Sequence, residues 1–210
     1  GGTLYSRGTG TGAKDSKAQA VVRFINERFP ELAPRRILDL GCGFGGQTCG
    51  YALAWAKAEV HGVDMGGALL RFGHARAESM GIPLHLHQMD LGETTFRADH
   101  FDFIVSNIVM HELPTAKLQQ MLAECHRLLK PGGLMVHQDV PTQKPDMDSG
   151  MALLSHWQRD HNDEPFWQTF AQTSVPSLMS EAGFDPSQQF EAYVKQLDGP
   201  LQWYFTGAVK

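Results

Sequence analysis

Short apolar runs alternate with segments of helical periodicity along most of the chain. Runs typical of buried strands occupy residues 37–40, 59–64, 83–89, 101–107 and 134–140. Between them, apolar residues recur at helical spacing, which predicts helices at 16–29, 47–57, 68–80 and 115–129. Alternation of this kind predicts a parallel sheet that is covered by helices on both faces.

Turn residues mark the ends of later elements. Lys130-Pro131-Gly132-Gly133 predicts that the helix before it stops there, because Pro and Gly follow its last turn. After a further helix at 175–182, Asp198-Gly199-Pro200 separates strand-like runs at 190–196 and 201–209. This arrangement favours a C-terminal β-hairpin.

Two segments stand apart from the alternation. The first fifteen residues are rich in Gly, Thr and Ser and predict an N-terminal arm. Residues 141–173 are polar, are interrupted by proline and contain aromatic side chains, Trp157 and Trp167 among them. Those aromatic residues either wall off a binding site or anchor the excursion to the sheet. We therefore expect an arm at 1–15 and one domain at 16–210 with an insertion at 141–173.

Composition narrows the possible partners. The 210 residues suffice for one domain, and 42% of them are hydrophobic. A net charge of −5 argues against electrostatic binding of nucleic acid or an anionic membrane. No apolar run approaches the 18–20 residues, roughly, that a membrane span needs. Three cysteines are too few for a disulfide scaffold, so we expect a reducing, cytoplasmic setting.

The most informative motif is the glycine-rich segment Gly41–Gly46, between the first strand and the next helix. Backbone amides at such a helix start can approach a ligand closely. The spacing satisfies both G-x-G-x-x-G and G-x-G-x-G, and either pattern alone is weak evidence. Asp39 decides between these patterns. G-x-G-x-x-G is typical of dinucleotide sites, and the Asp39 carboxylate would repel the pyrophosphate of a dinucleotide. A ligand that carries an ammonium and a sulfonium group would instead be held by it.

With that carboxylate, Ile37–Gly45 resembles the first motif of the class I S-adenosylmethionine-dependent methyltransferases. Three further features also match the pattern of this family. Asp64 ends the second predicted strand, and Asp90 follows the third predicted strand. The segment Glu124–Gly133 resembles the helix and turn that precede the fifth strand in the family. The resemblance implies an α/β fold with a Rossmann-like, doubly wound, seven-stranded sheet. The sheet would be mostly parallel, with an antiparallel strand from the C-terminal hairpin and helices on both faces.

The resemblance also implies which residues bind S-adenosyl-L-methionine. Asp64 would accept hydrogen bonds from the two ribose hydroxyls, and Met65 would pack on the face of the adenine. Asp90 would accept a hydrogen bond from the adenine amino group, with the apolar Leu91 as its neighbour. Asn107, after the fourth strand, would lie under the amino acid portion. Cys42 lies in the same loop, and we interpret its side chain as a small group that packs there. The expected cofactor contacts are Asp39, Gly41, Cys42, Gly43, Asp64, Met65, Asp90, Leu91 and Asn107.

Chemistry is expected beyond the carboxyl ends of the central strands. His111 is our candidate general base and acceptor contact, because an acceptor hydroxyl or ammonium must lose a proton and histidine titrates near neutral pH. Glu112 or Asp139 would orient it. His137 and Asp139 share one face of the fifth strand, so they could converge with His111. Two histidines and a carboxylate also suit a metal ion, but we expect hydrogen bonds instead and no metal.

The expected function is therefore methyl transfer from S-adenosylmethionine to an oxygen or nitrogen of a small-molecule acceptor. The candidate catalytic residues are His111, Glu112, His137 and Asp139, and the candidate acceptor contacts are Tyr5, His111, Trp157 and Trp167. The segment 106–109 lacks the Asn-Pro-Pro-Tyr motif of amino-methylating nucleic-acid enzymes, which disfavours such substrates. Carbon methylation, or a non-catalytic module that only binds the cofactor, stays open. A nicotinamide dehydrogenase is opposed by Asp39.

Overall fold

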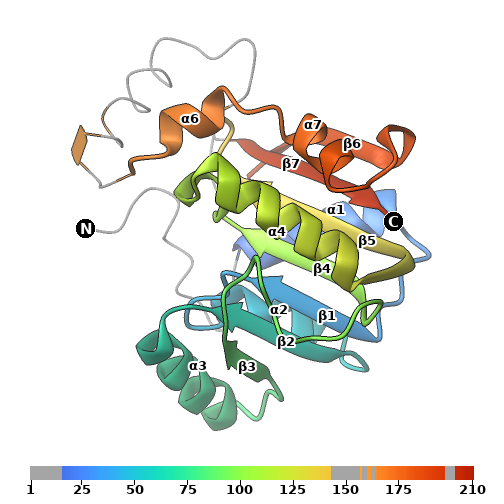
Figure 1. The fold of residues 1–210 in the computed structure, drawn as a ribbon. Coiled ribbons are helices and arrows are strands. Elements are labelled where there is room, and N and C mark those ends of the chain that lie inside the picture. The colour runs from blue at the N-terminus through green and yellow to red at the C-terminus, as the bar shows by residue number, and fades with distance from the viewer. Residues whose placement is uncertain (1–15, 143–156, 158–159, 162–163, 197–201) are drawn as a thin grey trace.

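The computed structural model describes residues 16–142, 157, 160–161, 164–196 and 202–210 (Figure 1). The expected N-terminal arm, with Tyr5, and most of the first part of the insertion lie outside these residues. The helices are α1 Ser16–Arg28, α2 Gly46–Ala54, α3 Gly67–Ser79, α4 Thr115–Leu128, α6 Trp167–Ala171 and α7 Val175–Glu181. The strands are β1 Arg36–Leu40, β2 Glu59–Asp64, β3 His85–Gln88, β4 Phe101–Asn107, β5 Leu129–Asp139, β6 Gln189–Lys195 and β7 Gln202–Val209. Two short 3₁₀ helices are η2 Met110–Glu112 and η3 Pro186–Gln188.

All seven strands form one sheet in the order β3-β2-β1-β4-β5-β7-β6. The pairs β2–β3, β1–β2, β1–β4 and β4–β5 are parallel, and β7 is antiparallel to both β5 and β6. The chain runs outward from β1 to β3 and then returns to β4, on the other side of β1. Strand order therefore reverses between β1 and β4, which is where open α/β sheets bind ligands. The sequence-based prediction of a seven-stranded, mostly parallel sheet is confirmed.

Each face of the sheet carries its own hydrophobic core. Leu38, Ile104 and Met135 pack with α4 and α7 on one face. Their sequence neighbours Ile37 and Phe103 belong to a second cluster, with α1 and Tyr51 of α2. Alternate strand residues point to opposite faces, so one apolar run supplies both cores. Figure 1 shows α4 in front of the sheet, α1 and α2 behind it, and α3 beside the edge strand β3.

Several element boundaries differ from the sequence-based prediction. The second helix ends at Ala54 instead of 57, and the third strand is confined to His85–Gln88 instead of 83–89. The helix before Pro131 ends at Leu128, but strand β5 begins directly at Leu129 instead of at 134. The register shifts between Phe101 and Phe103, so the Pro-Gly-Gly turn is accommodated as an irregularity within the strand. Among the described residues, no helix has the length and apolar character to cross a membrane.

Candidate active site

The glycine loop connects the end of β1 to the start of α2. Gly41, Gly43 and Gly45 have φ angles of 68°, 54° and 73°, in the left-handed region that favours glycine. A Cβ on Gly41 would lie 2.5 Å from a methyl group of Val109, so the loop packs closely on the segment after β4. A Cβ on Gly43 would meet no heavy atom within 4 Å. The loop therefore leaves open space beside Gly43 that a ligand can occupy.

Asp64, at the end of β2, fixes this loop. Its Oδ2 accepts a hydrogen bond of 2.8 Å from the Gly43 amide, and its Oδ1 accepts one of 2.7 Å from the Gly66 amide. Met65 follows with an exposure of 64%, which is high for an apolar side chain. Asp64 and Met65 thus lie beside the glycine loop, where the family resemblance places contacts to ribose and adenine.

Asp39 and Cys42 lie under the loop. The Asp39 carboxylate is buried and accepts a 2.6 Å hydrogen bond from the Thr48 hydroxyl of α2. The Cys42 thiol is also buried, and its sulfur would lie 2.8 Å from a Cβ on Gly62. Burial, and then the charges of Asp39 and Asp64, raise the pKa of this thiol. Cys42 is therefore an unreactive packing group.

Asp90, expected to bind the adenine amino group, forms an ion pair that the sequence-based reasoning missed. Lys117 of α4 donates to both carboxylate oxygens at 2.9 and 2.8 Å, and the Gly92 amide donates at 2.7 Å. The hydrogen bond from Lys117 comes first among the causes that hold the pKa of Asp90 below its ordinary value. The adjacent Leu91 is partly buried against the α4 face of the sheet.

The segment after β4 holds a strained residue beside a buried carboxylate. Ile108 has a φ of 56°, unusual for a β-branched residue, and its amide donates to the Gln138 carbonyl. The next two amides, of Val109 and Met110, both donate to Oδ2 of the fully buried Asp139. The strained turn is therefore held in place by the end of the neighbouring strand β5.

His111, on η2, is bound by the same carboxylate. Its Nδ1 lies 2.6 Å from Asp139 Oδ1, and its side chain is 2% exposed. Because an ionised carboxylate only accepts, Nδ1 carries the proton and Nε2 faces away from Asp139. Burial lowers the pKa of His111, but the Asp139 charge, its hydrogen bond and the charges of Glu164 and Glu112 outweigh burial and raise it.

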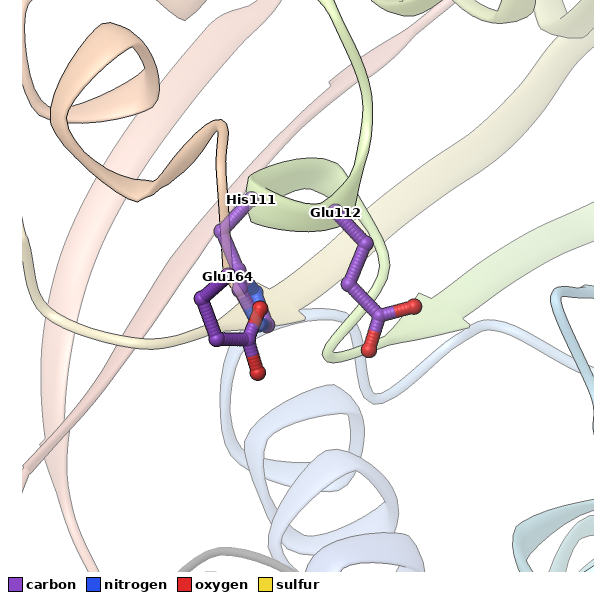
Figure 2. A group of neighbouring side chains, drawn as sticks. All are labelled: His111, Glu112 and Glu164. Atoms are coloured by element: carbon purple, nitrogen blue, oxygen red, sulfur yellow. The ribbon is translucent and has the colours of Figure 1, made fainter. Parts of the chain in front are cut away.

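Two further carboxylates converge on His111 from different parts of the chain. His111 Nε2 lies 3.5 Å from Oε2 of Glu164, which precedes α6, and Glu112 is the next residue on η2. One potential ligand atom from each of the three lies within 4.8 Å of the others, as Figure 2 shows. The pKa of Glu112 is raised, with burial as the largest cause. The interaction with His111 lowers this pKa, whereas the negative charges of Glu164, Asp139 and Asp64 raise it further. We call His111, Glu112 and Glu164 the His111 cluster.

Other candidate residues lie beside this cluster rather than in it. His137 points to the face of Asp139 as expected, but its Nδ1 hydrogen-bonds with the Ser106 hydroxyl at 2.7 Å. Its buried Nε2 has no hydrogen-bond partner among the described residues, and burial lowers its pKa to about 4. Asn107 points to the opposite face and donates to the Tyr51 hydroxyl.

The aromatic candidates have unequal positions. Trp167 is buried, and its ring lies edge-on to His111 with centroids 5.0 Å apart. Trp157 is 51% exposed and stacks on His161. The insertion therefore brings Trp167 and Glu164 to His111. Glu164 was missed by the sequence-based reasoning, because it lies where no periodicity indicates which side chains face the sheet; its position between aromatic residues was the one available signal.

Comparisons with known proteins agree with this geometry. Residues 37–133 match the family described as "Methyltransferase domain". A methyltransferase of Synechocystis, itself uncharacterized, is 32% identical over 151 residues, which cover 71% of this chain and 66% of that protein. The malonyl-[acyl-carrier protein] O-methyltransferase of Halorhodospira halophila is 32% identical over 166 residues, covering 76% of this chain and 52% of that protein. The chain thus spans about half to two thirds of the length of these relatives.

Substrates differ among the similar proteins. A ribosomal RNA small subunit methyltransferase C of Hahella chejuensis is 34% identical over 111 residues, covering 51% of this chain and 32% of that protein. Among solved structures, phosphoethanolamine N-methyltransferase 2 of Haemonchus contortus, in complex with S-adenosyl-L-methionine, superposes with a TM-score of 0.67 at 15% identity. The superposition covers 91% of this chain and 52% of that one. Family match, sequence relatives and sheet topology agree, and the chain therefore belongs to the class I S-adenosylmethionine-dependent methyltransferases.

Proposed function

We propose that this chain transfers a methyl group from S-adenosylmethionine to an oxygen or nitrogen of a small molecule, with His111 as general base. The observation that carries the proposal is the 2.6 Å hydrogen bond between His111 Nδ1 and buried Asp139. It leaves Nε2 on the other side of the ring, 3.5 Å from Oε2 of Glu164. His111 itself lies on η2, directly after β4, and β4 is next to the point where strand order reverses. A histidine oriented by a carboxylate is an arrangement typical of a general base.

The residues around the glycine loop fit the cofactor. The open space at Gly43, the exposed Met65 and the carboxylates of Asp39 and Asp64 offer backbone approach, an apolar surface and acceptors for hydroxyl and ammonium groups. When bound, the cofactor supplies an electrophilic methyl group on a sulfonium. The protein's own contribution is to orient the acceptor and to take its proton at His111 Nε2.

The insertion at 141–173 is proposed to cover the acceptor. Trp167 packs edge-on against His111, and Glu164 faces its Nε2, so this segment contributes side chains directly to the site. Enclosure of this kind excludes water from a group-transfer reaction. The catalytic role is kept for His111, with Asp139 as its positioning residue. Glu112 and His137 stay candidates for supporting roles.

A small-molecule acceptor is favoured over nucleic acid by the net charge of −5 and by the carboxylates that surround His111. A phosphate backbone would be repelled at such a site. Carbon methylation stays the second candidate, because His111 could equally remove an acidic C–H proton. We also propose a cytoplasmic location, in line with the three free cysteines.

Calorimetry with S-adenosylhomocysteine and NAD tests the proposed cofactor. We expect one binding site for S-adenosylhomocysteine and no binding of NAD. The variant Gly43→Ala should weaken binding at least tenfold, because its methyl group enters the open space beside the loop. Gly132→Ala is a matched control, since Gly132 has a φ of 77° and equally open surroundings but lies in β5. Both variants should lose about 1 kcal/mol of stability, and equal loss of cofactor affinity in both would contradict the assignment.

A further inference from the structure

The Asp90 carboxylate is held from two directions. Lys117, in the first turn of α4, donates to Oδ1 at 2.9 Å and to Oδ2 at 2.8 Å, and the Gly92 amide donates to Oδ1 at 2.7 Å. An ionised carboxylate has about four lone-pair sites, two on each oxygen. Both sites of Oδ1 are therefore occupied, and among the described residues only Lys117 donates to Oδ2. One acceptor site of Asp90 remains, and its place on the carboxylate is fixed.

This remaining acceptor lies where the end of β3 adjoins the end of β2. The register pairs Gln88 with Asp64, and the Gln88 side chain donates to the Met65 carbonyl at 3.1 Å. The Met89 amide donates to the Asp64 carbonyl at 3.3 Å. Because Asp90 is the next residue, it lies on the same edge of the sheet as Asp64 and Met65. This edge therefore carries an exposed apolar side chain, Met65, and a carboxylate acceptor, Asp90.

These two groups suit a flat heterocycle that has a donor on its edge. The base of S-adenosylmethionine is adenine, whose exocyclic amino group donates. Hypoxanthine has the same ring shape, but a carbonyl oxygen stands in place of the amino group, and an ionised carboxylate repels that oxygen because both only accept.

The orientation of the carboxylate decides how well it distinguishes the two bases. Hypoxanthine also has an N–H beside its carbonyl, and a carboxylate that is free to turn could accept from it. The hydrogen bonds from Lys117 and Gly92 hold Asp90 in one orientation. The Lys117 hydrogen bond is also the largest cause that holds the pKa of Asp90 below its ordinary value, so the carboxylate stays ionised. A fixed, ionised acceptor selects the amino group.

We propose that Lys117 is a positioning residue that fixes the Asp90 carboxylate and thereby makes the cofactor site select a 6-amino base over a 6-oxo base. This rests on the proposed function, in which the chain uses S-adenosylmethionine. Lys117 acts through Asp90 and needs no contact of its own with the cofactor. The side chains of this ion pair are 30% and 37% exposed, and such pairs contribute little to stability. Its effect is therefore expected in the choice of ligand rather than in folding.

Two ligands that differ at one position of the base test the proposal. S-Adenosylhomocysteine and S-inosylhomocysteine, which carries hypoxanthine, are titrated into the full chain by calorimetry at neutral pH. The measured quantity is the ratio of their dissociation constants. The parent protein should prefer S-adenosylhomocysteine by about tenfold or more, because a hydrogen bond to a charged group is replaced by a repulsive contact. Lys117→Met keeps the aliphatic chain but removes the ammonium, and should lower this preference by about fivefold or more.

Three controls separate positioning from folding. S-Inosylhomocysteine does not use the fixed acceptor, so Lys117→Met should change its affinity by less than about twofold, whereas a disturbed site would weaken both ligands alike. Lys117→Arg should keep the parent's preference within about twofold, since a guanidinium also donates to both oxygens of a carboxylate. Lys130→Met is the matched control. Lys130 is 34% exposed and pairs with Asp102 at the amino end of β4, so the ratio should not change.

Asp90→Asn provides a second, independent readout. If Lys117 and Gly92 hold the side-chain oxygen, the amide nitrogen takes the place of Oδ2 and presents a donor instead of an acceptor. The preference for S-adenosylhomocysteine should then fall by about tenfold or more, and S-inosylhomocysteine should bind more tightly than it binds the parent. An ion pair with a purely structural role would not produce this gain.

The proposal is overturned if the parent binds both ligands equally, or if Lys117→Met or Asp90→Asn keeps the parent's ratio. It is also overturned if Lys117→Arg loses the preference as Lys117→Met does. Each of these results leaves S-adenosylhomocysteine binding, and with it the proposed function, in place. Failure of the parent to bind S-adenosylhomocysteine would instead contradict the proposed function and the role of Lys117 together.

Discussion

His111 and His137 are both buried histidines near the same carboxylate, yet their surroundings have opposite consequences. His111 is hydrogen-bonded to Asp139 and faces Glu164, and its pKa is raised. His137 is hydrogen-bonded to the neutral Ser106 instead, and burial lowers its pKa to about 4. Burial alone keeps an imidazole neutral, whereas a carboxylate partner offsets that effect. Proximity to a catalytic region is therefore a poorer guide to chemistry than the charge of the hydrogen-bond partner.

His111→Gln should have the largest effect on turnover. The amide can still donate to Asp139, but no group remains at the position of Nε2 to take a proton. With the true acceptor, we expect turnover to fall by about 100-fold or more, with S-adenosylhomocysteine affinity within twofold. The measurement is methyl transfer from labelled cofactor under saturating conditions. A loss of less than about tenfold would show that His111 is not the base.

Asp139→Asn should reduce both turnover and stability. The carboxylate accepts from His111 and from the amides of Val109, Met110 and Val140, and an asparagine amide replaces one of its acceptor oxygens with a donor. We expect a loss of about 2–4 kcal/mol of stability and at least a tenfold loss of turnover. Urea unfolding and turnover are measured on the same preparation. If Asp139→Asn had the stability and the turnover of the parent protein, the Asp139 carboxylate would not be the cause of the difference between His111 and His137.

Acid should destabilise the protein through its neutral buried histidines. Burial lowers the pKa of both His61 and His137 from the ordinary value of 6.5 to about 4. Because the unfolded chain binds these protons first, their contribution is fully present above pH 6.5 and is lost as the pH falls toward 4. Each histidine accounts for up to about 3 kcal/mol. Urea unfolding between pH 7 and 4 measures the slope.

His61→Phe provides the test of that slope. His61 stacks on His85 and His87, so phenylalanine keeps a ring in the stack but binds no proton. The variant should show a flatter dependence of stability on pH than the parent. His74→Asn, at an exposed position of α3, is the control and should show the same dependence of stability on pH as the parent. Identical slopes in the parent and in His61→Phe would refute the assignment.

Ser106→Ala should have the smallest effect. It removes the hydrogen-bond partner of His137 Nδ1, which costs about 1 kcal/mol for a neutral buried group. Turnover should stay within threefold if His137 has a structural role. A large loss of turnover without loss of stability would instead place His137 in the catalytic machinery.

Much of this architecture was predictable because local signals and tertiary structure agree in the central strands. The runs at 59–64 and 101–107 coincide with β2 and β4, since both are apolar and buried on two faces. The third strand is shorter than predicted, as its predicted start lies at Pro83, which has no amide to donate. The Lys130–Gly133 turn correctly predicted the end of the helix before it, which is at Leu128. It did not indicate that β5 begins at Leu129 and continues through the turn, because the irregularity in its pairing with β4 is not specified by the sequence alone.

The site was predictable only in part. Strand alternation placed His137 and Asp139 on one face, but it could not indicate that His137 binds Ser106 while Asp139 binds His111. Glu164 reaches His111 from 53 positions further along the chain, by way of a segment without periodicity. Contacts made by irregular segments depend on the whole fold, and short-range patterns do not contain them.

An NMR titration of the histidine ring protons tests the central contrast most directly. With S-adenosylhomocysteine bound and no acceptor present, the His111 resonance should titrate with a pKa above 6.5. The His137 resonance should stay that of a neutral ring until the pH approaches 4. His111→Gln and Ser106→Ala assign the two signals. A His137 that titrates at a higher pH than His111 would contradict the account.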